Sequence, residues 1–168
     1  ISGGVVGGVW YILLGMFLRG AADQGYKQVV LRDELSGQSI RKFTNDRPVT
    51  VEAGTSVQEL IDNYLLRYHY KMFPVVRGDE LLGAVRLDQV KEVDENARAD
   101  TPVEQLVRKP DEGNSIDADA EAVDALQAMH KARGSRLMVV EDGRLVGILS
   151  LKDLQEFLAI KLELEDAR

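Results

Sequence analysis

FPVVRGDELLGAVRLDQV at residues 73–90 and LMVVEDGRLVGILSLKDL at residues 137–154 align with each other without a gap. Each stretch holds a short apolar run, a turn of charged residues and glycine, a second apolar run and the start of a helix-like segment. This order predicts a strand, a hairpin turn, a return strand and a helix. Because the pattern occurs twice, an internal repeat decides the fold before any single element does.

The residues upstream of each stretch extend the repeat. In the first repeat, Ser56 and Glu59 have the spacing of a capping box at the start of a helix. In the second repeat, Ile116 marks a short strand and Asp119 is the expected helix cap. The helix of the first repeat is one residue longer than its counterpart. Between the repeats, residues 101–107 are expected to form a short helix.

Each repeat is therefore predicted to be a small β-α-β-β-α unit, and the fold class is α/β (α+β). One such unit is too small to bury a core well by itself, so we expect the two to pair their sheets with pseudo-twofold symmetry. The expected domain limits are 40–95 for the first repeat, 96–112 for a connector and 113–168 for the second repeat with its C-terminal helix.

The composition of the chain excludes several functions. The formal net charge of −7 over 168 residues argues against a nucleic-acid partner, because phosphate contacts need a basic surface. The chain has no cysteine, which excludes disulfides and thiolate metal sites and fits a reducing compartment.

Residues 1–18 contain no charged side chain and predict a membrane helix or its C-terminal part. Glycines at positions 3, 4, 7, 8 and 15 would weaken a helix in water but give a small-residue face in a bilayer, so a buried core helix is the less favoured alternative. Basic residues follow from Arg19 onward, which places the rest of the chain in the cytoplasm. Residues 19–39 are expected to be a helical exit linker.

The repeated order of elements, with FPVV and LMVV each followed by a charged turn and with G-h-h-S-h-x-D at residues 147–153, resembles the tandem CBS domain, or Bateman module. The resemblance implies a site for an adenine nucleotide: AMP, ATP or an S-adenosyl compound. It implies that Ser150 contacts phosphate and Asp153 takes the ribose hydroxyls. The resemblance also places Gly147, which follows the second hairpin turn, at the site. The residues that would border the base are Ile116, Arg136, Leu137 and Met138.

Two alternatives stay open at this site. Ser150 could simply cap the last helix, and the cleft could be empty, as in modules that serve as interaction scaffolds. The first repeat departs from the pattern, because Arg86 stands at the position of the hydroxyl and Gln89 at that of the carboxylate. Arg86 could reach a phosphate bound between the repeats or could be a solvated residue at a strand end.

Residues 7–37, GGVWYILLGMFLRGAADQGYKQVVLRDELSG, resemble the last membrane helix and exit linker of site-2-protease-like intramembrane zinc metallopeptidases of the M50 type. That family holds zinc with an H-E-x-x-H helix, and nothing in this chain matches it. His69 and His130 lie in different repeats without neighbouring ligands, so no metal-binding or catalytic residue is expected here.

Together, the two resemblances imply a cytosolic regulatory CBS pair at the cell membrane. It would bind an adenine nucleotide or a partner, form a homodimer, and modulate an attached zinc metalloprotease whose zinc lies in the missing parent domain. Two alternatives remain: the regulatory CBS tail of a channel or transporter, and a purely structural dimerisation module.

Overall fold

The computed structural model describes residues 33–166. The membrane helix predicted at residues 1–18, and most of the exit linker, lie outside this range. Within the described range, no helix has both the length and the apolar character needed to cross a bilayer.

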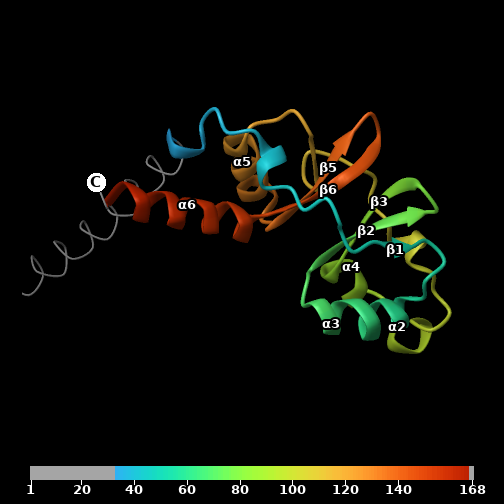
Figure 1. The fold of residues 1–168 in the computed structure, drawn as a ribbon. Helices are drawn as coiled ribbons and strands as arrows, with labels where there is room; N and C mark the ends of the chain where they lie inside the picture. Colours follow the sequence, from blue (N-terminus) through green and yellow to red (C-terminus); the bar gives the residue numbers. More distant parts are fainter. Residues whose placement is uncertain (1–32, 167–168) are drawn as a thin grey trace, which may run out of the picture. The chain divides into compact units, whose positions relative to one another are not determined.

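The first repeat has the predicted order of elements, with a three-stranded sheet in the order β1-β2-β3 (Figure 1). β1 runs parallel to β2, and β2 and β3 form the hairpin. The elements are β1 (Val51–Glu52), α2 (Val57–Leu60), a π-helical turn η2 (Ile61–Leu65), α3 (Leu66–Tyr68), β2 (Met72–Arg77), β3 (Glu80–Arg86) and α4 (Leu87–Lys91).

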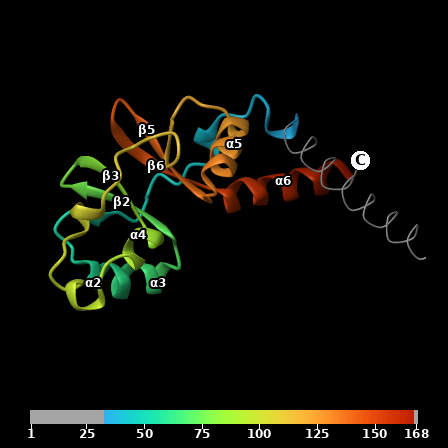
Figure 2. The same cartoon turned by 180° about the vertical axis from the view of Figure 1, so that it is seen from behind.

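The second repeat has the same topology, with a sheet in the order β4-β5-β6. Its elements are β4 (Ser115–Asp117), α5 (Ala122–Ala132), β5 (Arg136–Glu141), β6 (Arg144–Ser150) and α6 (Leu151–Asp166). Three short 3₁₀ turns precede or join the repeats: η1 (Ile40–Lys42), η3 (Glu95–Ala97) and η4 (Val103–Leu106). Figure 2 shows the same arrangement from behind, with α6 extending away from both sheets. The mixed α/β fold of two paired repeats is confirmed.

The extra residue of the first repeat is accommodated in η2. Between the N-cap and the hairpin strand, the first repeat has one residue more than the second, and residues 61–65 form a π-helical turn where α5 is regular. A π turn takes up one inserted residue without changing the face presented by the helix on either side. Tyr64 therefore still packs against the core of the first repeat.

The predicted helix caps are half right. Ser56 and Glu59 form the expected capping box of α2. The prediction for Asp119 is wrong, because the N-cap of α5 is Glu121. Residues before Glu121 are held in an extended path, since Ala118 N donates to Val140 O and Ile40 N donates to Ala120 O. The helix can start only after these bonds.

The two sheets pack face to face through a small apolar cluster. Met72 and Ala84 come from the first sheet, and Met138 and Ile148 come from the second. All four side chains are almost completely buried. Burial at this interface therefore links the repeats into one unit, as pseudo-twofold pairing requires.

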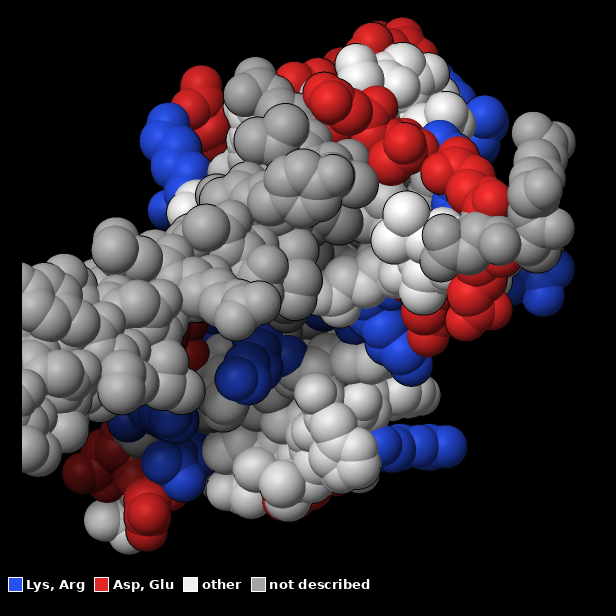
Figure 3. All heavy atoms as spheres, turned by 90° about the vertical axis from the view of Figure 1, so that its left-hand side faces the viewer, with Lys and Arg blue, Asp and Glu red and all other residues white. Residues whose placement is uncertain are grey.

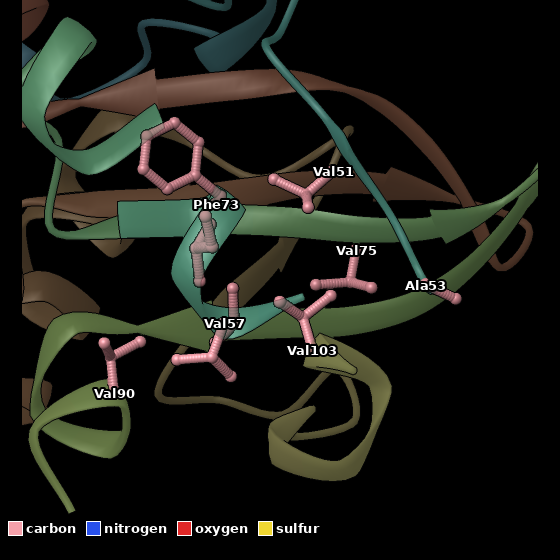
Figure 4. Packing of buried hydrophobic residues seen from close by; sticks show 9 residues of the cluster. Val51, Ala53, Val57, Phe73, Val75, Val90 and Val103 are labelled. Carbon is pink, nitrogen blue, oxygen red and sulfur yellow. The ribbon is translucent and has the colours of Figure 1, made fainter. Parts of the chain in front are cut away.

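Each repeat is completed by the segment that precedes the other repeat. In the first repeat, Val103 of the connector donates from its N–H to Thr55 O, and its side chain points into the core beside Val57 and Val75 (Figure 4). In the second repeat, the leading segment, defined as residues 37–46, takes the equivalent place through the Ile40 bond to Ala120.

The same exchange recurs on the return strands. Arg108 of the connector makes two backbone hydrogen bonds with Ala84 of β3, and Asn45 of the leading segment makes two with Ile148 of β6. Each of these two segments also forms an ion pair with the repeat that it contacts. Arg77 of β2 pairs with Glu104 of the connector, and Glu141 of β5 pairs with Arg41 of the leading segment. The two ion pairs occupy equivalent positions with their signs reversed.

Candidate ligand site at the start of the last helix

Ser150 and Asp153 lie at the junction of β6 and α6. Ser150 is the last residue of the strand, and α6 begins at Leu151, so Asp153 is the third residue of the helix. Ser150 Oγ lies 2.5 Å from Asp153 Oδ2, to which its hydroxyl donates, and it accepts from Asp153 N at 3.2 Å. Ser150 N also donates to Asp153 Oδ2 at 3.2 Å. The structure thus brings the two predicted site residues together as a capping box.

This geometry fits both uses of the pair that the sequence leaves open. The reciprocal bonds stabilise the first turn of α6 whether or not a ligand binds. Both bonds that Asp153 accepts use Oδ2, and among residues 33–166 no donor is bonded to Oδ1. The pair is therefore a cap with one carboxylate oxygen still able to accept a hydroxyl proton.

Arg136 lies directly opposite Ser150, because the two residues are register partners in the β5–β6 hairpin. Opposite residues of an antiparallel pair place their side chains on the same face. The Arg136 guanidinium lies over the ring of Tyr70 from the first repeat, 3.7 Å from its centroid. Its Nε is buried and has no hydrogen-bond partner among the described residues. A buried N–H donor without an acceptor is uncommon in folded proteins.

Arg86 brings a second guanidinium to this region from the first repeat. A Cβ on Gly134, two residues before Arg136, would lie 3.8 Å from Arg86 Nη1. Arg86 also forms a loose ion pair with Asp88, with 3.4 Å between Nε and Oδ1. Its side chain is only 29% exposed, so it is not the freely solvated strand-end residue that the sequence allowed as an alternative.

The first repeat has no equivalent of the Ser150–Asp153 pair. Gln89 Oε1 accepts from Arg86 N at 2.9 Å, so the cap is kept. Gln89 Nε2 donates to Leu106 O of the connector. Gln89, which stands at the carboxylate position, therefore links the connector to α4 through a hydrogen bond. We conclude that Gln89 serves the structure of the first repeat.

The other predicted site residues are divided among three places. Leu137 and Met138 are fully buried, and Met138 belongs to the interface between the sheets. Gly147 faces the leading segment, where a Cβ would overlap Asn45 O. Ile116 lines a separate pocket of about 580 Å³ beside β4 and α5, whose lining contains none of the residues from Arg136 to Met138, nor Ser150 or Asp153.

The pocket that contains Ile116 is acidic. Its charged lining residues are Asp111, Glu112, Asp117, Asp124, Lys131 and Asp142. Across residues 33–166, no three His, Cys, Asp or Glu side chains are grouped as a metal site. His69 instead ends the helix of the first repeat with a left-handed backbone, and His130 lies in the last turn of α5.

Charge is unevenly distributed on the face that Figure 3 presents. Lys and Arg atoms lie in the middle of this face and also at its upper left, lower left and right-hand edges, while Asp and Glu atoms gather mainly along its upper and right-hand side, with a further group at the lower left. A net charge of −7 therefore does not exclude a local anion site, because the field close to a ligand depends on its nearest groups.

Sequence reasoning did not predict the contact between Tyr70 and Arg136. Tyr70 belongs to the first repeat, and its counterpart in the second is Gly134, so the alignment gives no reason to assign it to the site. The only available signal is its position two residues before Met72, the first residue of β2 and the counterpart of Arg136. A repeat alignment reports equivalent positions and is silent on contacts between repeats.

The comparisons with known proteins agree with this architecture. The model of the CBS domain family matches residues 40–96 and again residues 103–160. The chain belongs to the CBS domain family. The CBS domain of a bacterial CNNM/CorC family Mg²⁺ transporter in complex with ATP has the same fold, with a TM-score of 0.62 and 19% identity over 79% of this chain and 95% of that one.

The curated relatives of this CBS pair carry protease names. The "Putative zinc metalloprotease Rip3" of Mycobacterium tuberculosis is 26% identical over 163 residues, which cover 95% of this chain and 41% of Rip3. The "Zinc metalloprotease MJ0392" of Methanocaldococcus jannaschii is 26% identical over 158 residues, covering 92% of this chain and 43% of that protein. The chain thus spans about two fifths of the length of these relatives.

Proposed function

We propose that this CBS pair is a regulatory module that binds an adenine nucleotide in the second repeat. One observation carries the proposal: Arg136, whose Nε is buried and has no partner among the described residues, lies opposite Ser150 in the hairpin. Arg86 Nη1 of the first repeat lies near Gly134, two residues before Arg136. Two arginines and a hydroxyl at a helix start form a set of donors suited to a phosphate.

The residues divide into two roles. Arg136 binds the phosphate from the second repeat, and Arg86 reaches it from the first. The Ser150 hydroxyl turns its single proton from Asp153 Oδ2 to the phosphate, while the bonds donated by Ser150 N and Asp153 N keep the helix capped. Asp153 accepts from the ribose hydroxyls through Oδ1, while Oδ2 keeps the helix capped. The edge of the strand from Arg136 to Met138, with the backbone near Ile116 in the neighbouring strand β4, borders the base. Ligand binding then favours the arrangement of the two repeats in which both arginines face one anion.

The parent protein is proposed to be an intramembrane zinc metalloprotease anchored by residues 1–18, with the CBS pair in the cytoplasm and paired as a homodimer. Two proteins named as zinc metalloproteases match more than nine tenths of this chain, including residues outside the CBS repeats. The likeness to the Mg²⁺ transporter domain, at 19% identity, concerns the fold alone. Relatives in sequence therefore favour the protease over the transporter alternative.

A scaffold without a ligand is the second candidate. The observation that favours it is the capping box itself, because the bonds between Ser150 and Asp153 already account for both residues as a helix cap. The two functions differ in whether the site takes an anion.

Calorimetric titration of the full chain in detergent micelles with AMP, ATP and S-adenosylmethionine tests the proposal. We expect at least one nucleotide to bind, and Asp153→Ala to abolish binding. Because that change also removes a cap, Asp153→Asn is the informative variant, since an amide oxygen keeps the cap but lacks the charge. Gln89→Ala is the matched control at the equivalent position and should leave affinity unchanged. Absence of heat and of any melting shift with all three ligands would establish the scaffold.

The assignment of the parent protein is tested separately. The gene region upstream of Ile1 should encode an H-E-x-x-H helix, and the purified longer protein should contain about one zinc per chain that is lost when the histidines are replaced. An upstream region with many spans and no such helix would assign the module to a transporter.

A further inference from the structure

Tyr70 and Arg136 form a contact across the two repeats. Tyr70 lies two residues before the start of β2 in the first repeat, and Arg136 opens β5 of the second. The centre of the guanidinium lies 3.7 Å from the ring centroid, which is stacking distance. Tyr70 is itself stacked on Tyr68, with 5.8 Å between centroids and an interplanar angle of 24°. The ring is thus also in contact with the last residue of α3.

Stacking fixes a guanidinium in a way that favours a further ligand. The five N–H donors of arginine point outward in the plane of the group, whereas the ring contacts its face. A stacked arginine therefore keeps its in-plane donors for an anion, and losing fewer rotamers on binding improves affinity. The buried Nε without a partner is one of these in-plane donors.

The carboxylates of the two equivalent helix starts are engaged with other residues. Asp153 is bonded to Ser150, and Asp88 is paired with Arg86. Within residues 33–166, no carboxylate lies within ion-pair distance of Arg136. The guanidinium is therefore held by an uncharged ring, and its charge is not neutralised by a neighbouring acid.

We propose that Tyr70 is a positioning residue that presets Arg136 for the phosphate, so that a residue of the first repeat sets the preference of the second-repeat site for phosphorylated over neutral nucleosides. This inference rests on the proposed function. It makes the site a property of the pair of repeats, because the second repeat alone would leave Arg136 free to rotate.

The affinities of the full chain for AMP and for adenosine, measured by titration in detergent micelles, test this role. Tyr70→Leu should weaken AMP binding by about tenfold, the scale of a lost desolvated cation–π contact, and should change adenosine binding less than about twofold. Tyr70→Phe keeps the ring and should restore AMP binding to the wild-type value. Arg136→Met should show the same selective loss as Tyr70→Leu.

Tyr64→Leu is the matched control. Tyr64 belongs to the same aromatic cluster, 5.8 Å from Phe73, and makes no cation–π contact with Arg136. It should cost similar stability and leave the ratio of AMP to adenosine affinity unchanged. If Tyr70→Leu and Tyr64→Leu lowered AMP affinity equally, or if Tyr70→Leu weakened AMP and adenosine alike, the positioning role would be overturned. If ATP rather than AMP binds the wild-type chain, ATP takes the place of AMP in the same comparison. Failure of the wild-type chain to bind any of AMP, ATP and S-adenosylmethionine would overturn the proposed function instead.

Discussion

Gly83 and Gly147 allow the crossing segments to approach the return strands. A Cβ at Gly83 would overlap Arg108 O of the connector, and one at Gly147 would overlap Asn45 O of the leading segment. Gly83 also has a φ of +146°, which disfavours other residues. The glycine in the motif of the second repeat therefore has a packing role that is independent of any ligand.

Gly147→Ala should lower the free energy of unfolding by about 2–4 kcal/mol, because backbone on both sides would have to move. Gly54→Ala is the control, since a Cβ there would meet nothing within 4 Å. Urea denaturation followed by circular dichroism gives both values. Equal stability of the two variants would contradict the close approach.

Two left-handed residues end the helices that precede β2 and β5. His69 has a φ of 58° and Arg133 a φ of 50°, at equivalent positions of the two repeats. A side chain at such a position strains the backbone, and glycine removes this strain at some cost in unfolded-chain entropy. Arg133→Gly should raise stability by about 0.5–1 kcal/mol, whereas Arg133→Ala should not. Thermal unfolding of the two variants distinguishes strain from loss of charge.

The resemblance to the CBS domain implied Ser150 and Asp153 as a pair. Their contact in the structure is local, because two residues three positions apart at a helix start meet as a cap in any context. Sequence reasoning did not find Tyr70 or the connector bond of Gln89. Both are contacts between segments far apart in the chain, and no periodicity reports them.

Among the elements, the π-helical turn η2 shows how the fold tolerates a difference in length between its repeats. Deleting Leu66, which is 65% exposed, should convert the helix of the first repeat to regular α-helix at a cost of no more than about 2 kcal/mol. Deleting Gln127 from α5, which has no such turn, should rotate its apolar face away from the core and unfold the second repeat. Hydrogen exchange of each helix measures both effects.

The order of elements was predictable for a physical reason. A buried strand, a turn and a return strand leave a short-range pattern, and the second copy confirmed the first. The position of the α5 cap was not predictable, because the start of that helix is delayed by a bond from Ile40, some eighty residues upstream. Local propensity predicts Asp119 as the N-cap, whereas contact with a distant segment makes Glu121 the N-cap.

On the scale of the whole molecule, the leading segment joins the N-terminal part of the chain to the second repeat. Arg41 donates to Asp119 at 2.8 Å and to Glu141 at 2.5 Å. The bond to Asp119, followed by that to Glu141, raises the pKa of the Arg41 guanidinium above its usual value. A group whose pKa is higher in the folded than in the unfolded state contributes stability that is fully present below the unfolded-state pKa. This stability is lost only as pH rises through the folded-state pKa, so the contribution of Arg41 should be constant across neutral pH.

Arg41→Met should therefore speed amide exchange at Ile40, Asn45 and Ile148, where the leading segment contacts the second repeat. Arg77→Met is the matched control, because it removes the equivalent pair with Glu104 and should affect Val103 and Ala84 instead. Hydrogen exchange by mass spectrometry resolves the two regions. Faster exchange in the same region for both variants would contradict separate clamps.

The opposite signs of the two ion pairs also govern which segment docks on which repeat. A leading segment placed on the first repeat would set Arg41 against Arg77, and a connector placed on the second would set Glu104 against Glu141. Like charges in contact disfavour the wrong exchange, and the correct one brings opposite charges together. The two repeats are otherwise similar in shape. The reversed charges therefore disfavour docking of either segment on the wrong repeat during folding, both within one chain and between two chains at high concentration.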